Sequence, residues 1–121
     1  MSILPTPTPL RPQSSVQHLK IRLDWGKPAL TIIDVRDRNV FNTQHILGAI
    51  SMPMTNLLKQ ALTSLETARD LYVYGETDEQ SAEAALQLRK AGFSNVAELR
   101  GGVAAWQALG FPVDQGCLAA A

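Results

Sequence analysis

Two short apolar runs constrain the fold of this 121-residue chain more than any other feature. Residues 29–35 read Ala-Leu-Thr-Ile-Ile-Asp-Val, and residues 70–74 read Asp-Leu-Tyr-Val-Tyr. Nearly continuous runs of β-branched and aromatic residues are typical of strands that are buried on both faces. Strands of that kind occur in parallel sheets with helices on either side. The two runs therefore predict an α/β fold.

Segments with helical periodicity or capping residues separate these runs. Ser14 or Ser15 can cap a first helix that ends near Trp25, and Asp37 can cap a second helix through Gln44. The alternation of strands and helices predicts one domain, with a central parallel sheet of about four or five strands flanked by helices on both faces. Further helices are expected at 57–65, at 78–91 and around Trp106, and further strands at 48–53 and 96–99.

The two ends of the chain lack such patterns, so we place the domain at residues 15–113. Residues 1–14 contain four prolines, which fix φ and remove backbone donors, and we expect a flexible tail there. The alternative is that the tail is a ligand for a proline-binding groove. Residues 114–121 show no periodicity and are also expected to be a flexible tail.

Composition excludes several classes of protein. Lysine plus arginine and aspartate plus glutamate number 11 each, so the formal net charge is zero and a basic nucleic-acid-binding surface is not expected. No apolar run approaches the ~20 residues that span a bilayer, and the N-terminus lacks the apolar region of a signal peptide. A single cysteine, Cys117, excludes an internal disulfide and a cysteine-rich metal site. We expect a cytoplasmic protein without a cofactor, a bound metal, or a membrane or nucleic-acid partner.

Three motifs follow one another along the chain. The first comprises Asp34-Val35-Arg36, Phe41, His45-Ile46, Gly48-Ala49-Ile50 and Met52-Pro53. The second comprises 71–74, 81–85 and Leu88, and the third Gly92-Phe93, Val96, Leu99, Gly101-Gly102, Trp106, Gly110 and Pro112-Val113. In this order and at these spacings, the motifs resemble those of the rhodanese homology domain, also called the rhodanese-like domain, over about residues 15–113. One departure is Gln44, where the family usually has glycine before the histidine.

The loop after the second motif's strand departs from the family at its reactive positions. The resemblance implies a six-residue loop that opens with a cysteine nucleophile and closes with arginine, followed by serine. The aligned loop here is Gly75-Glu76-Thr77-Asp78-Glu79-Gln80, followed by Ser81. Sulfur transfer in this family requires a thiolate that holds sulfur as a persulfide. Glycine has no side chain, so we expect no catalytic residue in this degenerate pocket loop.

The remaining loop residues have two interpretations. Thr77 with Gln80 three residues on fits a helix capping box, and Asp78 with Ser81 is a second capping register. In either register a cradle that attracts anions in the family presents carboxylates here, so thiosulfate or phosphate should be repelled. Three carboxylates in one loop could also hold a hard cation, although capping explains them as well.

Four further residues outside the loop have both a structural and a functional interpretation. The resemblance implies a structural hydrogen-bonding role for His45, and Asp34 with Arg36 is expected to form a structural pair at a strand end. Cys117 is expected to be incidental, or alternatively a mobile persulfide carrier. Trp106 is expected in the core.

These features lead us to expect a catalytically inactive rhodanese-like module that binds another protein or has a regulatory role. The alternative is a sulfurtransferase that uses Cys117 or a partner's thiol. The phosphatases that share this fold need a cysteine and an arginine at the two ends of their loop, and both are missing here.

Overall fold

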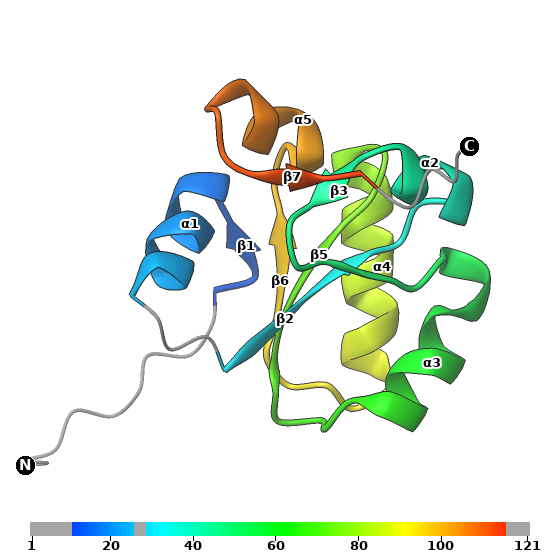
Figure 1. Cartoon of the computed structure of the whole chain (residues 1–121). Coiled ribbons are helices and arrows are strands. Elements are labelled where there is room, and N and C mark those ends of the chain that lie inside the picture. The colour runs from blue at the N-terminus through cyan, green and yellow to red at the C-terminus, as the bar shows by residue number, and fades with distance from the viewer. Residues whose placement is uncertain (1–10, 26–28, 116–121) are drawn as a thin grey trace, which may run out of the picture.

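A computed structural model describes residues 11–25 and 29–115 and shows a central sheet of five parallel strands (Figure 1). The predicted α/β class and parallel sheet are confirmed. In spatial order the strands are β1 (Gln13–Ser14), β6 (Val96–Leu99), β5 (Asp70–Tyr74), β2 (Leu30–Asp34) and β4 (Ile50–Ser51).

The two central strands pair over their full length. The register of β2 and β5 runs from Leu30 beside Asp70 to Asp34 beside Tyr74. Asp34 and Tyr74 therefore lie next to each other at the carboxyl edge of the sheet, where ligands bind in open α/β folds.

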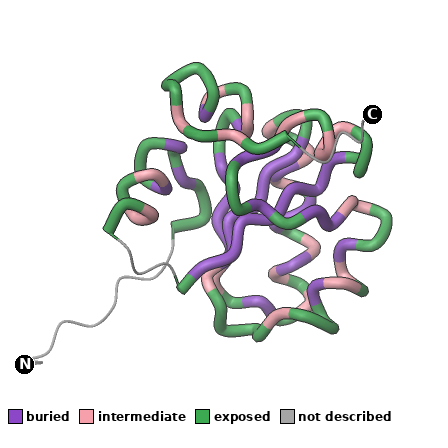
Figure 2. Tube along the Cα trace, in the orientation of Figure 1, coloured by how far each residue is buried: buried purple, intermediate pink, exposed green. Residues whose placement is uncertain are grey.

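Helices cover both faces of the sheet, and each face has its own apolar core. Alternate side chains of one strand point to opposite faces, so Ile33 packs on one side and Ile32 on the other. Figure 2 shows the strands buried at the centre of the molecule. One face carries α3 (Leu57–Ser64) and α4 (Asp78–Lys90), and the other carries α1 (Val16–Asp24) and α5 (Gly102–Ala108).

Local capping explains where the helices begin. The hydroxyl of Ser15 accepts a hydrogen bond from the backbone N–H of His18 (3.1 Å), so Ser15 caps α1 rather than Ser14. Asp37 precedes α2 (Arg38–Thr43), but its side chain makes no capping hydrogen bond, contrary to the prediction. A short 3-10 helix, η1 (Met54–Asn56), leads into α3. None of the helices in the described ranges is long and apolar enough to cross a membrane.

Both ends of the domain extend beyond the predicted limits. The carbonyls of Pro12 and Ser14 accept hydrogen bonds from the backbone N–H groups of Glu98 (2.8 Å) and Arg100 (2.9 Å), so residues 12–14 belong to the sheet and not to a flexible tail. A proline can occupy this edge because only its carbonyl is used. At the other end β7 (Val113–Asp114) pairs antiparallel with β3 (His45–Ile46). Residues 1–10 and Cys117 lie outside the described ranges.

We predict that β1 contributes measurably to stability. Deleting residues 1–14 should lower the melting temperature by about 4–8 °C relative to a chain that lacks only residues 1–10, since loss of two hydrogen bonds costs on the order of 1 kcal/mol in total. Thermal unfolding followed by circular dichroism measures the difference. Equal melting temperatures for the two truncated chains would show that β1 adds nothing.

Candidate functional site

A buried ion pair stands at the carboxyl end of β2. Asp34 is completely buried, and both of its carboxylate oxygens accept hydrogen bonds from the Arg36 guanidinium, at 2.7–3.1 Å. The backbone N–H of Arg36 also donates to Asp34 (2.9 Å). A buried carboxylate without such a partner would be strongly destabilising, so the two charges depend on each other. The expected pairing of Asp34 with Arg36 is present.

The same guanidinium connects β2 to its surroundings. Arg36 donates to the carbonyl of Gln44 (2.6 Å) and lies 5.5 Å from the centre of the Tyr74 ring. Burial lowers the pKa of Arg36, but the hydrogen bonds that its guanidinium donates to Asp34 and the charge of that carboxylate outweigh burial and raise the pKa above its usual value. Burial, followed by the charge of Asp34, raises the pKa of the Tyr74 hydroxyl. Both side chains therefore keep their protons at neutral pH.

His45 is buried in the strand that follows α2. Its Nδ1 lies 2.8 Å from the carbonyl oxygen of Phe41, and its ring stacks on the Phe41 ring with centroids 3.7 Å apart. Its Nε2 lies 3.6 Å from the carboxylate of Asp114 in β7. These contacts join α2, β3 and β7.

The loop between β5 and α4 is held by hydrogen bonds between its own residues and Ser81. The backbone N–H of Gly75 donates to the hydroxyl of Ser81 (2.9 Å), and the N–H of Glu76 donates to the carboxamide oxygen of Gln80 (2.7 Å). The Ser81 hydroxyl in turn donates to the carbonyl of Thr77 (3.1 Å). Two backbone donors that could face an anion are thus satisfied by side chains of the loop's own closing residues.

The start of α4 agrees with one of the two predicted capping registers. Thr77 is the N-cap, and its hydroxyl accepts from the N–H of Gln80 (3.1 Å). The reciprocal bond of the predicted capping box is different, because Gln80 reaches one residue further back, to Glu76. The alternative register with Asp78 as the cap is wrong. Asp78 accepts instead from the N–H of Gly101 (2.9 Å), which connects α4 to the turn before α5.

Gln80 fills the space that a side chain at position 75 would need. A Cβ atom built on Gly75 would lie 2.9 Å from Cγ of Gln80 and would overlap its carboxamide oxygen. The obstacle is the end of a flexible side chain, so it can move, but only by giving up the hydrogen bond to Glu76. Gly75 and Gln80 therefore match each other sterically, which the sequence did not reveal.

The carboxylates of the loop face outward. Glu76 and Glu79 are exposed, and Asp78 is half-buried with its carboxylate 3.4 Å from the Arg100 guanidinium. No group of three potential metal ligands gathers within residues 11–25 and 29–115. The loop therefore presents an acidic rim around a closed interior.

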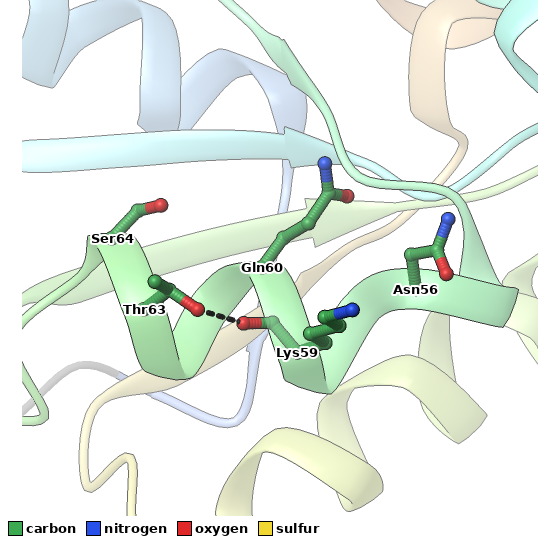
Figure 3. A pocket seen from close by; sticks show the side chains of 5 residues that line it. All are labelled: Asn56, Lys59, Gln60, Thr63 and Ser64. Atoms are coloured by element: carbon green, nitrogen blue, oxygen red, sulfur yellow. Dashed lines mark hydrogen bonds between the residues drawn. The ribbon is translucent and has the colours of Figure 1, made fainter.

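Two surface hollows of the described chain lie away from this loop. One is lined by Asn56 of η1 and by Lys59, Gln60, Thr63 and Ser64 of α3, as Figure 3 shows. The Thr63 hydroxyl donates to the carbonyl of Lys59 within the helix. The other is lined by His18, Ile21 and Arg22 of α1 and by Trp25, which follows the helix as its C-cap. Sequence reasoning expected the pocket at the loop after Tyr74 and identified neither hollow.

Comparison with known proteins places this geometry in a family. The family model described as a rhodanese-like domain matches residues 15–109. The solution structure of the rhodanese-like domain of the Alr3790 protein from Anabaena is 50% identical, with a TM-score of 0.85, over 93% of this chain and 85% of that one.

Two bacterial proteins are also similar to this chain in sequence. The uncharacterized protein YqhL of Bacillus subtilis is 39% identical over 75 residues, which cover 62% of this chain and 59% of YqhL. The probable adenylyltransferase/sulfurtransferase MoeZ of Mycobacterium tuberculosis is 37% identical over 91 residues, 74% of this chain and 23% of MoeZ. The chain thus spans little more than half of one relative and a quarter or less of the other.

We predict that Gly75→Ala and Gln80→Ala are energetically coupled. In the unchanged chain Gly75→Ala should destabilise by about 0.5–1.5 kcal/mol, because Gln80 must leave and one hydrogen bond is lost. With Gln80→Ala already present, the methyl group has room and the same change should cost less by at least about 0.5 kcal/mol. Urea unfolding of the four chains measures the coupling, and additive effects would contradict the contact.

Proposed function

We propose that this chain, which belongs to the rhodanese-like domain family, is a member that forms no persulfide at its loop and acts by binding another protein. The observation that carries the proposal is the closed loop. Gly75 stands at the nucleophile position, and the carboxamide of Gln80 occupies the adjoining space and satisfies the N–H of Glu76.

The electrostatics of the loop support the same proposal. A sulfur donor such as thiosulfate is an anion, and it would meet the carboxylates of Glu76 and Glu79 on approach. Gln80 offers no charge at the position where the family resemblance implies arginine, so an anion gains no bidentate partner. Exposed carboxylates at a capped helix start suit contact with basic side chains of a partner protein, since complementary charges speed and orient encounter.

The alternative is a sulfurtransferase in which the sulfur is held elsewhere. The resemblance to the probable sulfurtransferase MoeZ favours it. The sulfur would be carried by Cys117 or by a thiol of a partner, because Cys117 is the only cysteine of the chain. Under this alternative, Cys117→Ser should abolish any sulfur loading of the isolated protein.

We predict that the purified chain gains no sulfur atom from thiosulfate and transfers none to cyanide. Glycine at position 75 offers no nucleophile, and loss of a nucleophile costs on the order of 10⁶ in rate in enzymes that depend on one. Mass spectrometry after incubation with thiosulfate, and a thiocyanate assay, measure the two steps. Sulfur loading that is abolished in Cys117→Ser would support the alternative instead.

The binding part of the proposal has its own readout. The wild type and a Glu76→Gln, Glu79→Gln variant serve as matched baits, because neither change removes a loop hydrogen bond made by the described residues. A partner that contacts the rim should be retained by the wild type and lost, or bound several-fold more weakly, by the variant. Equal retention by both baits would exclude the rim as the contact surface.

We also predict that Gly75→Cys alone does not restore sulfur transfer. The new side chain must displace Gln80, and nearby carboxylates raise the pKa of a thiol, so it should stay largely protonated at neutral pH. Activity should return only when Gly75→Cys is combined with Gln80→Arg, Glu76→Gln, Asp78→Asn and Glu79→Gln. Asparagine keeps an oxygen that can accept from Gly101.

The measurement for these loop variants is sulfur transfer, together with iodoacetamide alkylation of the new thiol against pH in a Cys117→Ser background. Efficient transfer by the single variant, with a thiol pKa below about 7.5, would contradict the proposal that loop charge and Gln80 disable the site.

A further inference from the structure

The outer face of α1 carries a solvent-exposed apolar hollow that no part of the proposed function uses. His18, Ile21, Arg22 and Trp25 line it, and their spacing of three and four residues places them on one face of the helix. Trp25 is 80% exposed and Ile21 is 53% exposed. The opposite face of α1 packs into the core through Val16 and Leu19. Trp25 and Ile21 thus present neighbouring apolar side chains to solvent, as contact surfaces do.

Among the described residues that line this hollow, Arg22 carries a permanent charge, and its guanidinium is directed toward the protein. The guanidinium of Arg22 donates to the Tyr72 hydroxyl (3.2 Å) and pairs with the carboxylate of Asp70 (2.7 Å). The methylene groups of Arg22 are therefore the part of this side chain that lines the hollow. The surface therefore offers an indole face, an isoleucine side chain, an imidazole and an aliphatic stem, which suits an uncharged apolar occupant.

The chain itself contains such an occupant. Residues 1–10 read Met-Ser-Ile-Leu-Pro-Thr-Pro-Thr-Pro-Leu, a segment with no charged side chain and three prolines at alternate positions. Proline-rich segments favour the extended polyproline helix, which loses little entropy on binding and packs on aromatic side chains. We propose that this proline-rich segment of the same chain docks on the α1 hollow, with proline rings against the indole of Trp25.

The connection of the elements allows this docking within one molecule. Residues 11–14 lead through β1 straight into α1, which runs back alongside, so that the end of α1 returns toward the level at which β1 begins, as Figure 1 shows. Four extended residues and a nine-residue helix each span about 13 Å. Residues 5–10 in a polyproline helix reach about 19 Å from Arg11, which is sufficient to cross the hollow.

Acrylamide quenching of tryptophan fluorescence tests the proposal without altering the hollow. Trp106 is fully buried, so quenching of the intact protein reports mainly on Trp25, and a Trp25→Phe chain supplies the Trp106 background. Deleting residues 2–10 should raise the quenching constant about twofold, because the proline rings cover one of the two indole faces. Replacing Pro5, Pro7 and Pro9 by alanine should raise it similarly, and deleting residues 116–121 should not.

Further arms separate the competing occupants. A peptide of residues 1–11 added to the truncated chain should lower the quenching constant again, and an equal peptide with alanine for the three prolines should not. Quenching that is unchanged by the deletion would overturn the proposal. Protection of Trp25 that appears only at high protein concentration, together with a dimer in sedimentation, would assign the hollow to the segment of a second copy and would also overturn it.

Discussion

The buried pair of Asp34 and Arg36 is the interaction on which the carboxyl edge of the sheet depends. Asp34 has no exposed surface, so its charge is tolerable only because the guanidinium supplies both partners. The same guanidinium holds the carbonyl of Gln44 and lies over the ring of Tyr74. The Tyr74 hydroxyl then accepts the N–H of Ile46 (3.1 Å). One ion pair therefore fixes the position of α2 and β3 against the ends of β2 and β5.

The degenerate loop begins at Gly75, directly after Tyr74, on whose ring the Arg36 guanidinium lies. Tyr74 is immobilised by its burial and by Ile46, so Gly75 leaves the sheet at a defined point. From there Ser81 and Gln80 take the first two backbone donors, and Asp78 ties the helix start to Gly101. The fold of the family is thus present up to the nucleophile position. The backbone N–H groups that could hold an anion are instead bonded to side chains of the protein. The loop therefore differs from the family's loop at several positions, including Gly75 and Gln80, and not only by the loss of the cysteine side chain.

The sequence predicted the frame well because periodicity and capping are local properties. The runs at 29–35 and 70–74 contain β2 and β5. Ser15 caps α1, and Thr77 caps α4. The misjudged parts depend on contacts between distant residues. Pro12 and Asp114 lie in segments without periodicity, and only pairing with β6 and β3 orders them. Asp37 is a residue type that commonly caps helices and it stands at the N-cap of α2, yet its side chain makes no capping hydrogen bond.

The candidate site was predictable in what it lacks and not in what replaces it. Alignment of the motifs is sufficient to show that Gly75 stands at the family's nucleophile position, because the alignment depends only on the order of residues along the chain. Whether Gln80 caps its own helix or reaches back over Gly75 depends on a side-chain rotamer, and the two choices have the same sequence. The distinction has a functional consequence. A carboxamide inside the loop satisfies the N–H of Glu76 without bringing a charge, so the loop keeps its shape with no bound anion. A loop whose backbone donors are already satisfied is preformed, so the partner proposed above would meet a defined shape and the loop would lose little entropy on binding.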